Sequence, residues 1–206
     1  MPRTETKHTT TFTRPGEVTY ILPEPSSSTV TIILPPKSAW TSGSHWHESH
    51  TEYLRVIQGV AKVTIQNRTC TYRPSDGIIT IPKFAVHEWS RVLDLEDSDV
   101  NNEELIVQEW TDPADGLKEV FFRNLNSVIL ERSGKGWFGS VVFMLQLWTI
   151  FHKLDNWPVI LDGPFYVRWL LTHVVVGVGA RLGILCGLRA VYDEYTPREL
   201  IDRRSR

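Results

Sequence analysis

Apolar and polar residues alternate in short runs from about residue 17 to residue 110. The runs are rich in β-branched residues and are separated by turn residues, a pattern typical of β-strands. Gly59 permits the positive φ of a tight hairpin, and residues 74–77 (Pro-Ser-Asp-Gly) form a strong turn sequence. The pattern predicts strands at residues 18–22, 29–34, 44–47, 52–58, 61–66, 69–73, 78–81, 87–92 and 105–110. Their spacing favours a β-sandwich or β-barrel.

After about Asp112 the alternation gives way to apolar runs of helical length. Runs at residues 137–151, 165–180 and 182–192 predict helices. The stretch from residue 169 to residue 188 is long enough to cross a bilayer, but it contains His173 and Arg181, which disfavour insertion. We therefore expect the helices to pack on the barrel or on a second subunit. Peripheral membrane contact is the first alternative, and a true span is the second.

The alternating pattern and the longer apolar runs together predict three regions. We expect a flexible N-terminal segment at residues 1–16, a β-barrel at residues 17–112 and a mostly helical extension at residues 113–206. Within the barrel region, six of the eleven residues from 94 to 104 are acidic, which predicts a solvated loop.

The amino-acid composition of the chain argues against several classes of protein. With 22 basic and 24 acidic residues among 206, the chain has no overall positive field for nucleic acid. Two cysteines are too few for a disulfide framework. The first residues lack the apolar stretch of a secretory signal, so we expect a cytoplasmic protein, with membrane association as the alternative.

The candidate chemistry lies in a histidine-rich stretch. His45 and His47 are two residues apart, so on a strand both imidazoles project from one face. Glu52 would face the other way on an unbroken strand, but a bend at residues 48–51 lets it point inward. His87 begins a later strand and supplies a third imidazole. Three imidazoles and one carboxylate suit one divalent transition metal, Fe, Mn, Ni, Cu or Zn.

This spacing resembles the first motif of the cupin family, Gly-X5-His-X-His-X(3,4)-Glu-X6-Gly. The match is complete from His45 to Gly59, whereas Ala39 stands at the opening glycine, with Gly43 close by. The resemblance implies a mainly β fold, a single cupin (jelly-roll) β-barrel with a C-terminal α-helical extension.

The second cupin motif, Gly-X5-Pro-X-Gly-X2-His-X3-Asn, matches less fully. Gly77 is one residue too close to Pro82, Phe84 replaces the second glycine, and Arg91 replaces the asparagine, while His87 is in register. These departures put loop geometry and pocket shape in question more than metal binding. The resemblance implies the metal ligands His45, His47, Glu52 and His87, with Glu52 and His87 also catalytic.

Residues near the ligands are assigned by strand parity. Trp89 and Arg91 share the parity of His87 and are expected to line a substrate pocket with Val56 and Phe84. Arg91 could hold a carboxylate or phenolate there. We expect Trp46 to face the core, Glu88 to lie at the rim and His50 to be exposed. The alternative for His50 is that it supports a metal ligand by a hydrogen bond or transfers a proton.

The whole chain resembles small single-cupin proteins of filamentous fungi, through residues 21–25, 121–124 and 194–197. Several of these are cupin-domain oxidoreductases of polyketide gene clusters, including clusters that make alkyl salicylaldehydes. The resemblance implies a metal-dependent oxidoreductase acting on a small polyketide or aromatic-precursor intermediate, in a chain expected to form a homodimer. The alternatives are a metal-assisted dehydratase, cyclase or isomerase on the same kind of substrate, and a non-catalytic ligand-binding module.

Overall fold

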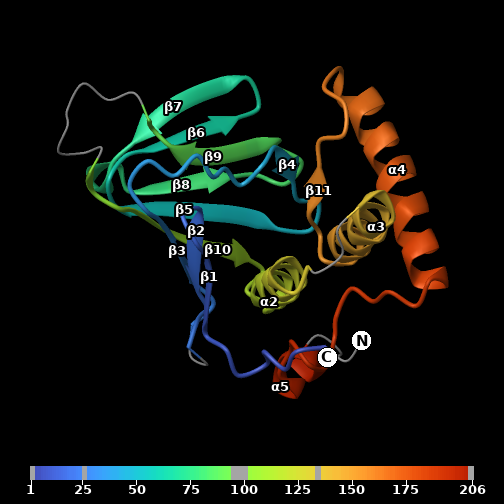
Figure 1. Ribbon diagram of the computed structural model, residues 1–206. Coiled ribbons are helices and arrows are strands. Elements are labelled where there is room, and N and C mark those ends of the chain that lie inside the picture. Colours follow the sequence, from blue (N-terminus) through green and yellow to red (C-terminus); the bar gives the residue numbers. More distant parts are fainter. Residues whose placement is uncertain (1–2, 25–26, 94–101, 133–135, 204–206) are drawn as a thin grey trace. The chain divides into compact units, whose positions relative to one another are not determined.

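The computed structural model describes residues 3–24, 27–93, 102–132 and 136–203 (Figure 1). The chain divides into two compact units. The barrel unit is Thr10–Ala114, and the helical unit combines Met1–Thr9 with Asp115–Arg206. Of the predicted acidic loop at residues 94–104, residues 94–101 lie outside the described part of the chain.

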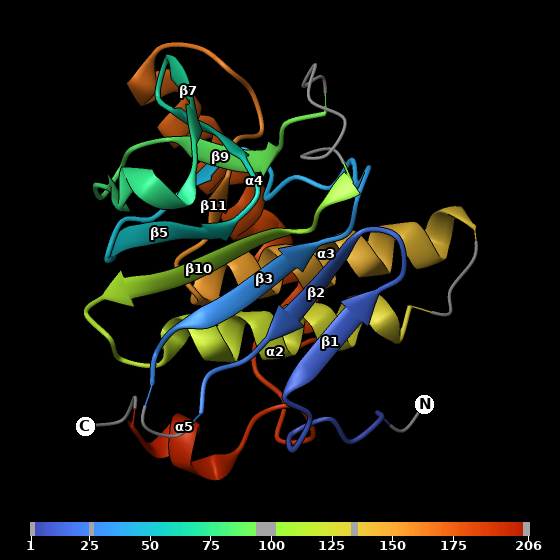
Figure 2. The same ribbon diagram turned by 90° about the vertical axis from the view of Figure 1, so that its left-hand side faces the viewer.

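The described residues of the barrel unit form two antiparallel sheets, so the fold of this unit is mainly β. One sheet has the order β1-β2-β3-β10-β5-β8 and faces the viewer in Figure 2, and the other has the order β4-β9-β6-β7. The strands are β1 (Thr11–Arg14), β2 (Val18–Ile21), β3 (Val30–Leu34), β4 (His45–Trp46), β5 (Thr51–Gln58), β6 (Ala61–Ile65), β7 (Arg68–Tyr72), β8 (Ile78–Ile81), β9 (His87–Arg91) and β10 (Leu105–Asp112). A single 3-10 turn, η1 (Pro74–Asp76), precedes β8 in this part of the chain.

The core of the barrel unit lies between the two sheets and follows the alternation in the sequence. Every second residue of β3, β5, β9 and β10 is buried. The largest buried side chains include Trp46 and Trp89, each about 1 % exposed. All nine predicted strands are present, with ends within two residues of the predicted ones.

The N-terminal segment differs from the prediction of a flexible tail. Residues 11–14 form β1, which pairs with β2 through the turn at Pro15 and Gly16. Residues before it are held in the helical unit, where the Arg123 guanidinium donates hydrogen bonds to the carbonyl oxygens of Lys7 and Thr9. The sequence did not indicate this strand, because the segment is rich in threonine and the strand has one buried apolar residue, Phe12.

The described residues of the helical unit contain α2 (Leu117–Leu130), α3 (Trp137–Lys153), β11 (Trp157–Pro158), α4 (Phe165–Leu185) and α5 (Arg198–Arg203). Helices α3 and α4 lie side by side (Figure 1). A Cβ atom at Gly179 would collide with the Trp148 ring, and one at Gly183 would collide with Thr149 Oγ1. Glycine at these positions therefore allows the two helices to approach closely.

Two of the three predicted helices are α3 and α4, but the predicted helix at residues 182–192 is not a separate element. Helix α4 continues to Leu185 and ends where Gly187 adopts a φ of 81°. The Leu188 N–H then donates to the Gly183 carbonyl, as in a Schellman cap.

Among the described helices, Phe165–Leu185 is long and apolar enough to cross a membrane, judged by length and composition. Its most apolar window has a mean hydropathy of 1.3 and is 33 % buried. An exposed apolar stripe runs along this helix through residues three or four positions apart: Val167, Leu170, Val174, Val178 and Leu182. We call these five residues the α4 stripe.

Candidate metal centre

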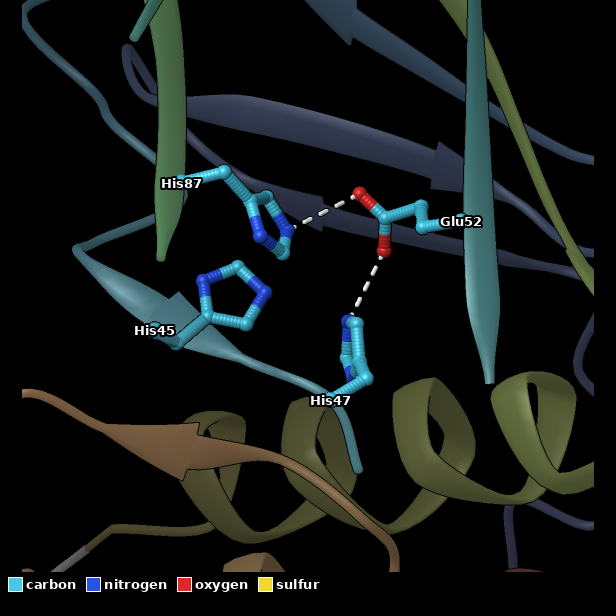
Figure 3. Close-up of side chains that lie close together, drawn as sticks. All are labelled: His45, His47, Glu52 and His87. Carbon is cyan, nitrogen blue, oxygen red and sulfur yellow. Dashed lines mark hydrogen bonds and ion pairs between the residues drawn. The ribbon is translucent and has the colours of Figure 1, made fainter. Parts of the chain in front are cut away.

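The structure brings the four predicted ligands together inside the barrel unit (Figure 3). His45 on β4 and His87 on β9 are register partners in one sheet, His47 follows β4 directly, and Glu52 comes from β5 in the other sheet. Each offers one ligand atom, and all four atoms lie within 4.8 Å of one another. The four residues are between 1 % and 8 % exposed. The cluster therefore joins the two sheets.

The chain reaches this arrangement through a bend. Strand β4 ends at Trp46, the backbone bends at Glu48 and Ser49, and β5 begins at Thr51. The bend changes the parity between His47 and Glu52, so that both point inward. Along β5, Glu52, Leu54 and Val56 are then buried in alternation.

Backbone carbonyl groups fix the orientation of two imidazoles. The Nδ1–H of His45 donates to the Gly43 carbonyl at 2.7 Å, and the Nδ1–H of His87 donates to the Ala85 carbonyl at 2.9 Å. With the proton on Nδ1, the lone pair of each Nε2 is left for the cluster. Hydrogen bonds of this kind are how proteins orient histidine ligands toward a metal.

The carboxylate of Glu52 lies between two imidazoles. Its Oε2 is 3.0 Å from His47 Nε2, and its Oε1 is 3.2 Å from His87 Nε2 (Figure 3). Because His87 Nε2 presents a lone pair, it and the carboxylate oxygen face each other as two electron-pair donors, which a cation between them would satisfy. Neighbouring ligands of a metal with bonds of about 2.1 Å are about 3 Å apart, so the four residues fit a divalent transition metal.

The electrostatic setting keeps His45 neutral. Burial, together with the adjacent imidazoles of His87 and His47, holds the pKa of His45 well below its usual value. Glu52 opposes this shift without reversing it. Since only a neutral imidazole can donate its lone pair, His45 is in the ligand form near neutral pH.

Three of the predicted pocket residues face the interior of the barrel unit and one does not. Trp89 and Arg91 follow His87 on the buried face of β9, and Val56 is buried on β5. Phe84 lies in the turn before β9 and is 43 % exposed. Its N–H donates to the His47 carbonyl, so this turn lies beside the four-residue cluster.

The expected exposure of His50 is wrong, because His50 is 5 % exposed. Residues 47–50 are a short connection between two strands with buried faces, which keeps this side chain close to the core. Trp46 is buried as expected, and its Nε1–H donates to Glu48 Oε1. Glu88 is half-buried on the outer side of β9.

Sequence reasoning missed two inward polar residues on β10. Glu109 and Thr111 are 6 % and 7 % exposed, and Thr111 is the register partner of Glu52. The alternation that buries Leu105 and Val107 continues through both, so parity could have found them. Burial raises the pKa of Tyr20, which lies near Glu109. The positive charge of Arg14 opposes this rise, and the negative charge of Glu109 adds to it.

No protein-family model matches the chain. It is similar to the "Probable oxidoreductase virH" of Hypocrea virens, with 28 % identity over 158 residues. That alignment covers 73 % of this chain and 66 % of the relative, just under two thirds of the relative's length.

Solved structures resemble part of the chain. A sugar phosphate isomerase from Acidithiobacillus ferrooxidans matches with a TM-score of 0.32 and 21 % identity, over 40 % of this chain and 47 % of that one. An oxalate decarboxylase from Lactobacillus farciminis matches with a TM-score of 0.32 and 21 % identity, over 46 % and 24 %. A predicted oxalate decarboxylase from Thermotoga maritima matches with a TM-score of 0.36 and 15 % identity, over 46 % and 78 %.

Proposed function

We propose that this protein is a metal-dependent cupin enzyme, an oxidoreductase that acts on a small polyketide or aromatic-precursor intermediate of fungal secondary metabolism. The observation that carries the proposal is the buried cluster of three imidazoles and one carboxylate that joins the two sheets. The cupin spacing from His45 to Gly59 and the similarity to an oxidoreductase-named fungal protein support the reaction class.

In this proposal His45, His47, Glu52 and His87 hold one divalent ion, which supplies Lewis-acid or redox chemistry when bound. The carbonyl groups of Gly43 and Ala85 hold two of the imidazoles in the required tautomer. The Glu52 carboxylate would balance part of the ion's charge, and its two oxygens lie beside His47 and His87. The burial of all four side chains keeps bulk water from the reacting groups.

The test begins with deletion of the gene and profiling of small metabolites, because the accumulated compound is the candidate substrate. Purified protein should contain about one equivalent of a transition metal by elemental analysis and should convert that compound to a product of different oxidation level. Glu52→Gln should abolish the conversion. His152→Ala, which changes an exposed histidine on α3, should leave it unchanged.

The outcomes separate the alternatives. Conversion without a change of oxidation level would replace the oxidoreductase with a metal-assisted dehydratase, cyclase or isomerase. A protein that contains no stoichiometric metal, and whose loss leaves every metabolite at its wild-type level, would contradict an enzymatic role and favour a ligand-binding module.

A further inference from the structure

The turn between β8 and β9 holds two residues of the four-residue cluster through its backbone. The Phe84 N–H donates to the His47 carbonyl at 2.7 Å, and the Ala85 carbonyl accepts the Nδ1–H of His87 at 2.9 Å. The Ala85 N–H closes the turn on the Pro82 carbonyl at 3.1 Å. The backbone of Phe84 is therefore fixed beside the cluster.

The backbone conformation of this turn is unfavourable for phenylalanine. Phe84 has a φ of 64°, as at the third position of a type II turn, which favours glycine. Glycine would make the same backbone hydrogen bonds without this strain. The Phe84 side chain is 43 % exposed, so its partial burial offsets the strain without adding much stability. Strained residues of this kind are concentrated at functional sites, which points to a role for the ring other than packing.

The cluster is most accessible on the side where this turn is attached. The His47 side chain is 9 % exposed, whereas the side chains of Glu52 and His87 are 1 % and 0 % exposed. A small molecule that approaches the cluster from solvent therefore meets the β4 segment first. Because the Phe84 N–H is bonded to the His47 carbonyl, the exposed Phe84 side chain belongs to the surface around this approach.

We infer that Phe84 determines specificity, its ring contacting the apolar or aromatic body of a small molecule whose polar head group binds the metal. The inference rests on the proposed function, because it requires a metal held by the four-residue cluster. An aromatic ring gains free energy by covering an apolar body, and it gains more by stacking on or meeting the edge of another ring. With glycine at this position the same body would stay in contact with water. Phe84 therefore favours ligands with an apolar body over ligands that have the same head group alone.

Two hydroxamates test the inference, because they share one metal-binding head group and differ in the body attached to it. Benzohydroxamate carries a phenyl ring, and acetohydroxamate carries a methyl group. Binding of each to the full chain loaded with Co²⁺ is followed by the visible absorption of the ion. We expect the wild type to prefer benzohydroxamate by about tenfold, and Phe84→Gly to reduce this preference by about fivefold. The affinity for acetohydroxamate should stay the same in both proteins.

Lys37→Gly is a matched control for the change of backbone. Lys37 is exposed and also has a φ of 64°, in a turn that the Ser38 N–H closes on the Pro35 carbonyl at 3.1 Å. Both variants replace a strained residue by glycine, so each should melt within about 3 °C of the wild type. Lys37→Gly should keep the full preference for benzohydroxamate.

The outcomes distinguish a failure of this inference from a failure of the proposed function. A chain that binds no Co²⁺ would contradict the metal-dependent function, and the inference with it. Co²⁺ binding without benzohydroxamate binding, or with the same preference in Phe84→Gly as in the wild type, would overturn the role of Phe84 alone. A large fall in melting temperature or a loss of Co²⁺ in Phe84→Gly would instead make Phe84 a structural residue.

Discussion

Phe84 occupies a backbone conformation that glycine usually adopts. Its φ is 64°, and it stands where the cupin motif has a glycine. Gly59 and Gly77, two other motif positions, have φ values of 79° and 78°. A left-handed conformation costs a residue with a side chain about 1–2 kcal/mol, so the chain tolerates strain at Phe84. The turn before His87 thus keeps a glycine-like backbone although its residue differs.

Gly59 has a second constraint that Gly77 lacks. A Cβ atom at Gly59 would lie 2.9 Å from the Glu104 carbonyl oxygen, whereas nothing lies within 4 Å of one at Gly77. We expect Gly59→Ala to lower the free energy of unfolding by about 2–4 kcal/mol, from strain and steric overlap together. Gly77→Ala should lower the free energy of unfolding by about 1 kcal/mol, because backbone strain is its only cost. Urea unfolding measures both, and equal losses would contradict the steric argument.

His45 makes stability depend on pH. Its pKa in the folded state lies well below the usual value of 6.5. Above pH 6.5 it is neutral in both states. As the pH falls below 6.5, the unfolded state takes up a proton that the folded state does not, so the free energy of unfolding falls by up to about 1.4 kcal/mol per pH unit. We expect melting temperature and metal content to fall together between about pH 6.5 and pH 5. Unchanged values over this range would contradict a neutral, buried His45.

At the scale of elements, the bend between β4 and β5 decides which histidine joins the four-residue cluster. His47 points to the cluster, while His50, three residues later, is buried but is not among the four clustered side chains. We expect His47→Ala to reduce metal content at least tenfold, whereas His50→Ala retains about one equivalent even if its melting temperature drops. Elemental analysis and thermal unfolding separate the two effects. Equal metal loss in both variants would place His50 in the coordination shell.

The strands could be predicted because their alternation reports directly on two packed sheets, but α2 could not. The buried side of that helix includes Lys118, Arg123, Asn124 and Asn126, so apolar periodicity is broken where the helix packs. Asn124 is satisfied by the Val120 carbonyl and by Thr196, far along the chain. Buried polar side chains with hydrogen-bond partners far along the chain produce no local pattern of apolar residues, so the sequence did not predict this helix.

The cluster of three histidines and one glutamate was predictable for a related reason, and its surroundings were not. The parity of His45 and His47 and the cupin-like spacing indicate from local sequence alone which side chains come together. The exposure of Phe84 and the burial of His50 depend on how loops close over strands that are remote in sequence. Strand parity places Arg91 inward, but it cannot show that the described chain leaves two of its nitrogens without acceptors.

At the scale of the whole molecule, the helical unit exposes more apolar surface than a monomer in water usually does. Besides the α4 stripe, Trp137 is 79 % exposed and Leu185 is 82 % exposed. Helix α4 also carries Arg168 and Arg181, charges that disfavour a transmembrane position. We therefore propose that a second copy of the chain covers this surface.

Light scattering and membrane fractionation test that proposal. We expect a dimer at micromolar concentration, and we expect Val174→Glu on the α4 stripe to give a monomer with an unchanged metal content. Thr31→Glu, on the half-buried side of β3, serves as a charge-matched control in the barrel unit and should remain dimeric. A native protein that stays in the membrane pellet after carbonate washing would contradict the proposal and make α4 a membrane anchor.

Strand β4 is only two residues long and meets β9 at a single register pair, His45 and His87. So short a strand has few backbone hydrogen bonds of its own, and an ion shared by residues 45, 47, 52 and 87 would act as a cross-link that closes the loop between them. We expect removal of the metal by a chelator to speed amide hydrogen exchange around residues 44–50, while β5 and β10, paired over their lengths, stay protected. In that case the bound ion would also stabilise the fold of its own site around β4.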